Sequence, residues 1–294
     1  MLSSGALAAL ADFAGAMLPL QARDLQTRID ERLAALPNRL NEYGYDAYGM
    51  SPSWMRRMLL PVVLLYRYYF RVETFGIDRL PQGRVFAIAN HAGQLPFDGM
   101  MLAATLLMDA EPPRIARSMG EYWIPKMPWV SVAATRTGAL VGTPENCRHM
   151  LQNDECVVVF PEGVRGMNKR FSQRYQLQRF GKGFMRLALE TATPVVPIAI
   201  VGSEEQQPGI ANLEGLGRMF GLPALPITAT FPWLGPLGLL PLPVKYRIYF
   251  GEPLRFDGDP SGEDSVIEGK VNEVKAQIAS MLEHGRRERP GIFR

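Results

Sequence analysis

The residue best suited to proton transfer is a histidine between a predicted strand and a predicted helix. Residues 84–89 form a short, mostly apolar segment, which predicts a buried strand, and the apolar residues 100–108 predict a helix. His91 lies in the intervening loop, where open α/β sheets usually place their sites. A neutral imidazole can accept a proton near pH 7, and a carboxylate such as Asp98 can fix its tautomer. We therefore predict that His91 is a general base and Asp98 its partner.

Two further stretches combine an apolar strand with residues that suit a site. The apolar run 156–160 leads directly into Phe-Pro-Glu-Gly-Val-Arg-Gly, residues 160–166, which shares Phe160 with it. Residues 194–201, bounded by prolines at their start, form another apolar strand that ends before Gly202 and Ser203. The ends of parallel strands meet at one edge of a sheet, so we expect both stretches to lie near His91.

Strands and helices are predicted to alternate along the chain, which indicates an α/β fold with a largely parallel sheet and helices on both faces. The predicted strands are 84–89, 115–117, 139–141, 156–160, 194–201 and 246–250. The predicted helices are 5–36 with a break near Pro19, 54–71, 100–108, 144–151 with Thr143 as N-cap, 184–191 and 266–283. We expect an N-terminal helical, membrane-associating segment over 1–72, an α/β domain over 73–284 and a basic tail over 285–294.

The three stretches occur in an order that resembles the glycerolipid acyltransferases, which include lysophosphatidic acid and glycerol-3-phosphate acyltransferases. Asn-His followed by Asp resembles motif I of that family, Phe-Pro-Glu-Gly-x-Arg-Gly motif III, and Val-Val-Pro-Ile motif IV. Together they span residues 90–203. Arg136 and Gly138, followed by residues 142–146, are a loose match to motif II.

The spacing of His91 and Asp98 departs from the family pattern. The family has four residues between the histidine and the aspartate, whereas this chain has six. Positions seven apart on a continuous helix share a face but are separated by ~10 Å. Gly93 and Pro96 permit a turn that brings Asp98 back to His91.

The resemblance implies direct acyl transfer without a cofactor or metal. His91 would accept the proton of an acceptor hydroxyl as that hydroxyl attacks a fatty acyl thioester, either acyl-CoA or acyl carrier protein, and Asp98 would stabilise the imidazolium. Glu162, Gly163 and Arg165 would position the head group of a lysophospholipid or glycerol-phosphate-like acceptor, and Arg165 suits a phosphate. The predicted substrate-binding residues are Asn90, Arg136, Glu162, Gly163, Arg165 and Lys182.

Plainer interpretations of the same residues stay open. Asp98 can be the N-cap of a helix over 99–108, and Glu162 can cap a helix or pair with Arg165. The same residues also fit a thioester or lipid hydrolase. A third possibility is a lipid-binding protein of the same fold that lost catalysis through the longer spacing.

A basic stretch over 165–186 contains seven arginines and lysines and no acidic residue. It suits anionic lipid head groups or the phosphates of coenzyme A, and equally a merely solvated face. The strongest motifs belong to no nucleic-acid-binding module, so we expect no nucleic acid partner. The seven are Arg165, Lys169, Arg170, Arg174, Arg179, Lys182 and Arg186.

The composition fits a folded protein in a reducing compartment. The chain has 294 residues, 47% of them hydrophobic, and a net charge of only +3, which by itself indicates no partner. Two cysteines, Cys147 and Cys156, predict no disulfide framework. Their spacing with His149 matches no usual zinc pattern.

Membrane contact is predicted without a spanning helix. The apolar residues 1–20 lack a basic leading region, which argues against a signal peptide, and arginines interrupt the helix over 54–71. Residues 219–244 are uncharged but hold six prolines, which no spanning helix tolerates. We expect this segment to form part of an acyl pocket, to enter one leaflet, or to be an ordinary core loop. The predicted location is the cytoplasmic face of a membrane, with peripheral attachment.

Overall fold

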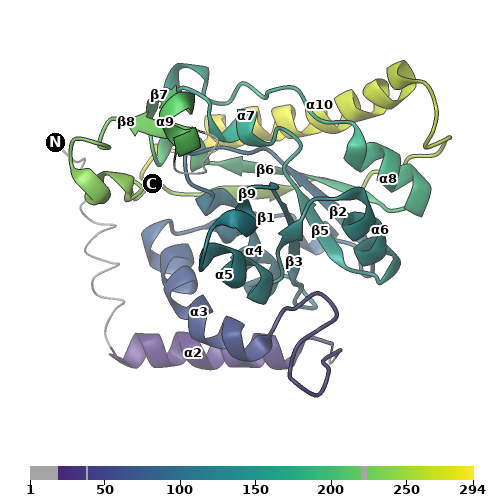
Figure 1. The fold of residues 1–294 in the computed structure, drawn as a ribbon, viewed down its shortest axis with the longest axis horizontal. Coiled ribbons are helices and arrows are strands. Elements are labelled where there is room, and N and C mark those ends of the chain that lie inside the picture. Colours follow the sequence, from purple (N-terminus) through teal and green to yellow (C-terminus); the bar gives the residue numbers. More distant parts are fainter. Residues whose placement is uncertain (1–18, 38, 220–223) are drawn as a thin grey trace.

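The computed structural model describes residues 19–37, 39–219 and 224–294. Its main sheet has seven strands in the order β1-β9-β6-β2-β5-β3-β4, and β7 and β8 form a second sheet (Figure 1). The strands are β1 (Glu73–Phe75), β2 (Val85–Ala89), β3 (Ala116–Gly120), β4 (Leu140–Val141), β5 (Cys156–Val159), β6 (Val195–Val201), β7 (Gly209–Leu213), β8 (Leu225–Thr228) and β9 (Arg247–Phe250).

Within the described residues, six α-helices lie where the sequence predicts helices, whereas three short ones, over 130–136, 164–167 and 214–219, were not predicted. The α-helices are α2 (Pro19–Ala34), α3 (Pro52–Leu64) with the π-helix η1 (Leu65–Tyr69), α4 (Phe97–Met108), α5 (Val130–Arg136), α6 (Pro144–Gln152), α7 (Val164–Met167), α8 (Gly183–Thr191), α9 (Glu214–Met219) and α10 (Asp264–Glu288). Short 3-10 helices are η2 (Ile77–Arg79), η3 (Ile124–Lys126), η4 (Phe171–Gln173), η5 (Ser203–Glu205) and η6 (Gly235–Leu239). The N-cap prediction for α6 is confirmed, because the Thr143 hydroxyl accepts a hydrogen bond from the Asn146 N–H. The first part of the predicted N-terminal helix, residues 5–18, lies outside the described residues.

The predicted fold class is confirmed. β2 pairs in parallel with β5 and with β6, and β3 pairs in parallel with β5 and β4. Every residue of β2 and β6 is buried, which is why their sequences are continuous apolar runs rather than alternating ones. The exceptions are β9, which pairs antiparallel with β6, and β1, which is parallel to β9.

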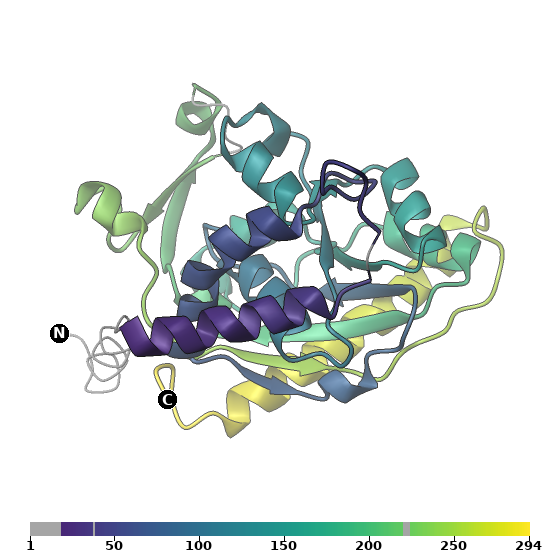
Figure 2. The same ribbon diagram turned by 90° about the horizontal axis from the view of Figure 1, so that it is seen from below.

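Alternate side chains of the sheet contribute to two different cores. Phe86 and Ile88 of β2 pack with residues of α6, α8 and α10, whereas Val85, Ala87 and Ala89 pack with α4 and η1. Helices α2 and α3 then pack on the outer side of α4 in a third cluster. In Figures 1 and 2, α10 accordingly lies along one face of the sheet and α2 and α3 lie on the other. The division of the chain at residues 72 and 284 stays a prediction.

The segment that follows β6 differs from an ordinary core loop. It contains the β7–β8 sheet, α9 and η6, which Figure 1 places at the opposite end of the molecule from α6 and α8. Trp233 and Leu237 are 73% and 69% exposed, so most of this segment is not core. Ala224 and Thr228 are buried within the segment, and the chain re-enters the main core near Val244, which is fully buried.

Candidate active site

The side chains of His91 and Asp98 are in direct contact. Asp98 Oδ2 lies 2.7 Å from His91 Nδ1, and the Asp98 side chain is fully buried. The same oxygen accepts a hydrogen bond from the Ala92 N–H at 2.8 Å, and Oδ1 accepts one from the Gly99 N–H at 2.7 Å. An ionised carboxylate accepts hydrogen bonds only, so it favours the tautomer with the proton on Nδ1. That tautomer leaves the lone pair on Nε2 for a reacting group.

A turn before α4 makes this contact possible at the longer spacing. Pro96 is the N-cap of α4, and Asp98 is the second residue of its first turn, so the N-cap interpretation of Asp98 is wrong. The loop from His91 to Pro96 bends back, with Gly93 at φ +82°. A Cβ on Gly93 would lie 2.2 Å from Gln206 Nε2, so this position needs glycine for both its dihedral angle and its space. The two residues are therefore not seven positions apart on one helix.

Asn90 joins β2 to β6 immediately before the histidine. Its side-chain Oδ1 accepts a hydrogen bond from the Ile200 N–H at 2.7 Å, and its Nδ2 donates to the Ile200 carbonyl at 3.2 Å. The residue is fully buried. Both ends of the amide thus satisfy main-chain groups and fix where the loop with His91 leaves the sheet.

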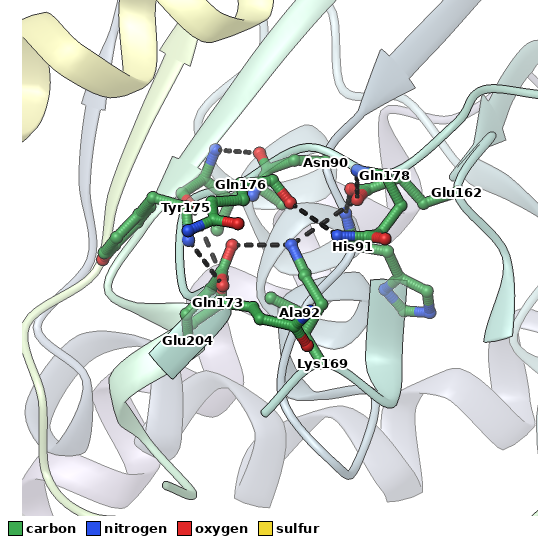
Figure 3. Close-up of polar contacts among 12 residues, drawn as sticks. Asn90, His91, Ala92, Glu162, Lys169, Gln173, Tyr175, Gln176, Gln178 and Glu204 are labelled. Carbon is green, nitrogen blue, oxygen red and sulfur yellow. Dashed lines mark hydrogen bonds and ion pairs between the residues drawn. The ribbon is translucent and has the colours of Figure 1, made fainter. Parts of the chain in front are cut away.

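Glu162 holds the main chain of the histidine (Figure 3). Its Oε1 accepts a hydrogen bond from the His91 N–H at 2.9 Å, and its Oε2 accepts one from the Gln178 N–H at 2.7 Å. Glu162 is 1% exposed and, among the described contacts, it does not pair with Arg165. The carboxylate therefore connects the motif I loop with the segment after α7.

Lys169 belongs to the basic stretch over 165–186, but it is a buried cation and faces neither solvent nor an external phosphate. Its Nζ lies 2.8 Å from Glu204 Oε1 and 3.5 Å from Glu162 Oε2, and the three side chains are almost completely buried. Glu204 Oε2 also accepts a hydrogen bond from the Tyr175 N–H at 2.8 Å. Burial raises the pKa of Glu204, and the charge of Lys169 opposes that rise. Two features of the sequence point to the Lys169–Glu204 pair. Lys169 lies in a stretch without acidic residues, and Glu204 and Glu205 come just after a buried strand.

The other predicted site residues lie in three different surroundings. Arg165 is exposed, and its Nη2 donates to the Arg179 carbonyl at 3.3 Å. Arg136 donates to the Gly49 carbonyl at 2.8 Å and its guanidinium lies 4.2 Å from the Tyr45 ring centre, in contact with the loop before α3. Lys182 forms ion pairs of 3.0 and 3.4 Å with Asp264 and Glu268 on α10.

Gly163 and Phe160 shape the surroundings of the imidazole. The Phe160 ring stacks on the His91 ring with 4.4 Å between the ring centres. Gly163 has φ +57°, and a Cβ there would lie 3.0 Å from the Glu121 carboxylate. The motif III turn therefore packs against His91 on one side and against the segment after β3 on the other.

A separate cavity of about 360 Å³ lies at the amino-terminal ends of β2, β3 and β5, opposite the strand ends near His91. Its lining includes Asp46, Arg117 and Glu155, and Arg117 forms ion pairs with both acids at 2.6 and 3.0 Å. It contains none of the residues around His91. We interpret these ion pairs as the attachment of the loop before α3 to the sheet.

In the described part of the chain, no histidines, cysteines and acids are grouped so that they could hold a metal ion. Cys147 and Cys156 are both buried free thiols. Over the same residues, no helix is both long enough and apolar enough to cross a bilayer.

Comparisons with known proteins agree on the family. A sequence model described as Acyltransferase matches residues 71–201. Uncharacterized proteins of Mycobacterium tuberculosis and Mycobacterium leprae are 38% identical over 255 residues, which is 84% of this chain and 71% and 70% of theirs. A mouse protein named DGAT1/2-independent enzyme synthesizing storage lipids is 25% identical over 212 residues, 70% of this chain and 59% of its own.

The fold is that of a solved acyltransferase. The crystal structure of the 1-acyl-sn-glycerophosphate acyltransferase PlsC from Thermotoga maritima matches with a TM-score of 0.52 and covers 78% of each chain at 18% identity. The motifs occur in the same order as in such enzymes, and the residues between them form a largely parallel sheet. This chain belongs to the glycerolipid acyltransferase family.

Proposed function

We propose that this protein transfers a fatty acyl group from a thioester donor to the hydroxyl of a lysophospholipid or glycerol-phosphate-like acceptor. The observation that carries the proposal is the 2.7 Å contact between His91 and a buried Asp98, in a chain of the acyltransferase family. That contact supplies a base with a fixed tautomer at the end of a parallel strand. The donor is acyl-CoA or acyl carrier protein, and no metal or cofactor takes part in the step.

In the proposed reaction, His91 Nε2 accepts the hydroxyl proton while the hydroxyl oxygen attacks the thioester carbonyl carbon. The tetrahedral intermediate then collapses, the C–S bond breaks, and the imidazolium returns its proton to the leaving thiolate. Asp98 stabilises the imidazolium through the Nδ1 hydrogen bond. Glu162 and Lys169 do not touch the reacting atoms in this scheme. Glu162 positions the His91 main chain, and Lys169 holds Glu162.

Arg165 is the proposed contact for an acceptor phosphate. It follows Glu162 and Gly163 on the motif III turn, it is exposed, and a guanidinium can donate two parallel hydrogen bonds to a phosphate. The substrates of such a reaction are lipids, so peripheral attachment to the cytoplasmic face of a membrane is part of the proposal.

The test is acyl transfer with radiolabelled acyl-CoA and acyl carrier protein over a panel of acceptors. The panel contains lysophosphatidic acid, other lysophospholipids, glycerol 3-phosphate and, because of the name of the mouse relative, mono- and diacylglycerol. Labelled product with a phosphate-bearing acceptor supports the proposal. Release of free fatty acid at the same rate with and without acceptor would instead indicate a hydrolase. Lipid binding without turnover would indicate a protein that kept only the fold.

A further inference from the structure

An apolar lobe, residues 209–219 and 224–240, exposes large side chains beyond the core. Trp233, Leu237 and Leu240 are 73%, 69% and 61% exposed. The sequence has only two charged residues, Glu214 and Arg218, between 206 and 244. Exposed apolar surface of this extent marks an interaction site. Its other exposed members are Ile210, Leu213, Leu216, Met219 and Leu234.

A second apolar feature, the tryptophan spur, comprises residues 122–132. Trp129 is 86% exposed and has φ +65°, a conformation that residues other than glycine rarely adopt. Tyr122, Val130 and Val132 are also exposed. A strained backbone that holds a tryptophan in water indicates a function for the exposed ring. Tryptophan is enriched at membrane–water interfaces, where its apolar ring and its polar N–H are both satisfied.

The arginine segment, residues 165–179, supplies positive charge beside these surfaces. Arg165, Arg170, Arg174 and Arg179 are all exposed, and none is in an ion pair within the part of the chain that the structure describes. The sequence has no acidic residue from 163 to 189. Arg165 and Arg174 each donate a hydrogen bond to a main-chain carbonyl, of Arg179 and Phe171. The segment thus has four exposed guanidinium groups whose charge no carboxylate of the described chain balances.

All three features follow the carboxyl ends of parallel strands, at the same end of the sheet as His91. Strands β2, β3, β5 and β6 are mutually parallel, and the loop with His91 follows β2, the spur β3, the arginine segment β5 and the lobe β6. The Asn212 amide of the lobe donates to the Asn168 carbonyl of the arginine segment at 2.7 Å. Because β6 and β3 lie on opposite sides of the β2–β5 pair, the lobe and the spur flank the histidine. Figures 1 and 2 both place the lobe on the outside of the molecule.

We propose that this edge docks on a membrane surface that contains anionic phospholipid. The lobe and the spur enter the head-group region on either side of His91, and the arginine segment lies over lipid phosphates. The combination of tryptophan and aliphatic side chains with unpaired arginines fits this partner better than a second copy of the chain, because arginine segments of two copies repel each other. The proposal rests on the proposed function for its lipid substrate and names the surface through which that substrate is reached.

The test is co-sedimentation of the full chain with vesicles of phosphatidylcholine, with or without phosphatidylglycerol. Wild-type protein is expected to bind both and to bind the anionic vesicles more tightly, with a preference that decreases as salt is added. The double variant Trp233→Ser/Leu237→Ser and the single variant Trp129→Ser should each weaken binding at least about tenfold, since each removes exposed apolar area from the bilayer contact. Arg174→Gln/Arg179→Gln should lower the affinity for anionic vesicles roughly tenfold and leave the affinity for neutral vesicles unchanged.

Matched controls lie at the opposite end of the parallel strands, because Leu254 pairs with Val195 at the start of β6 and α10 begins at the end of the molecule away from the lobe (Figure 1). Val266 is an exposed apolar residue at the start of α10, and Arg255 is an exposed arginine that follows β9. Val266→Ser and Arg255→Gln should bind vesicles as wild type does. If they weaken binding as much as the lobe and spur variants, or if those variants bind normally, this surface is not the docking site. Light scattering tests whether a second copy of the chain occupies this surface instead. A wild-type dimer that the lobe variants dissociate would overturn the proposal.

Two further measurements separate this proposal from the proposed function. His91→Ala should bind vesicles as wild type does, and the surface variants should retain acyl transfer to an acceptor dissolved below its micelle concentration. Surface variants that lose vesicle binding support the docking site even if no acyl transfer is found with any substrate. If the wild-type protein catalyses acyl transfer but the surface variants bind vesicles as it does, the docking site is wrong and the proposed function stands.

Discussion

His91 Nδ1 lies 2.7 Å from Asp98 Oδ2 even though six residues separate them in the sequence. Three donors converge on the Asp98 carboxylate: the imidazole and the main-chain N–H groups of Ala92 and Gly99. The aspartate thus fixes the ring and the turn that carries it.

Removal of the imidazole should abolish turnover and leave the fold intact. In His91→Ala, we expect kcat to decrease by about 10³-fold or more, because the acceptor hydroxyl loses its base. The matched control is His284→Ala, since His284 is an exposed histidine on α10 whose Nε2 pairs with Glu288. The measurement is acyl transfer together with circular dichroism. Full activity in His91→Ala would exclude His91 as the base.

Neutralising Asp98 should reduce kcat far more than KM. In Asp98→Asn, the amide no longer selects the Nδ1–H tautomer or stabilises the imidazolium, and a decrease of roughly 10²- to 10⁴-fold is expected. Asp264→Asn is the control, because Asp264 is an exposed aspartate whose pKa is lowered by hydrogen bonds to Lys182 and Arg186 far from the imidazole. A KM effect without a kcat effect in Asp98→Asn would contradict the assigned role.

Lys169 should matter for stability through the charges that it faces. In Lys169→Met, Glu162 and Glu204 lose their cation in a buried site, and a loss of about 3–5 kcal/mol in the free energy of unfolding is expected. Lys169→Met/Glu204→Gln should recover much of this loss, because one of the two acids becomes neutral. Urea denaturation measures both variants.

The control for Lys169 is Lys182→Met, which removes an ion pair with the exposed Asp264 and should cost about 1 kcal/mol or less. If the two lysine variants are equally stable, the buried ion pairs contribute little. As a positioning residue, Lys169 should also affect kcat more than KM, and Lys169→Arg should restore part of kcat.

Gly93 should tolerate no side chain. Gly93→Ala combines a φ of +82° with a Cβ placed 2.2 Å from Gln206 Nε2, so we expect a loss of about 1–3 kcal/mol and reduced turnover. Gly269→Ala is the control, because this exposed position on α10 has no atom within 4 Å of an added Cβ. That variant should gain roughly 0.5–1 kcal/mol from helix propensity. Thermal unfolding that ranks the two variants in the opposite order would contradict the tight turn.

The two cysteines should be inert in the folded protein. Burial raises the pKa of both the Cys147 and the Cys156 thiols to about 11. At pH 8 only about one thiol in a thousand is then ionised, and the thiolate is the species that alkylating reagents attack. Iodoacetamide should therefore label both residues in urea and neither in buffer, as mass spectrometry can show. Fast labelling of the native chain would mean that these side chains are accessible.

Much of the fold was predictable because its signals are local. Continuous apolar runs indicate strands buried on both faces, and β2, β5 and β6 have such runs. The short strands β1, β7 and β8 were not predicted, since three to five residues with mixed burial carry no clear pattern. The antiparallel direction of β9 was also beyond the sequence, because strand direction depends on pairing partners that lie far apart in the chain.

The sequence by itself determined the residue types of the site and their order: a histidine and an aspartate after one strand, and Glu-Gly-x-Arg after another. Only the tertiary structure decided that Asp98 reaches His91, that Glu162 holds the His91 main chain, and that Lys169 is buried between two acids while Lys182 pairs with α10. The physical reason is that a strand or helix is specified by neighbouring residues, whereas a hydrogen bond across the sheet edge depends on the turns and packing that bring distant segments together.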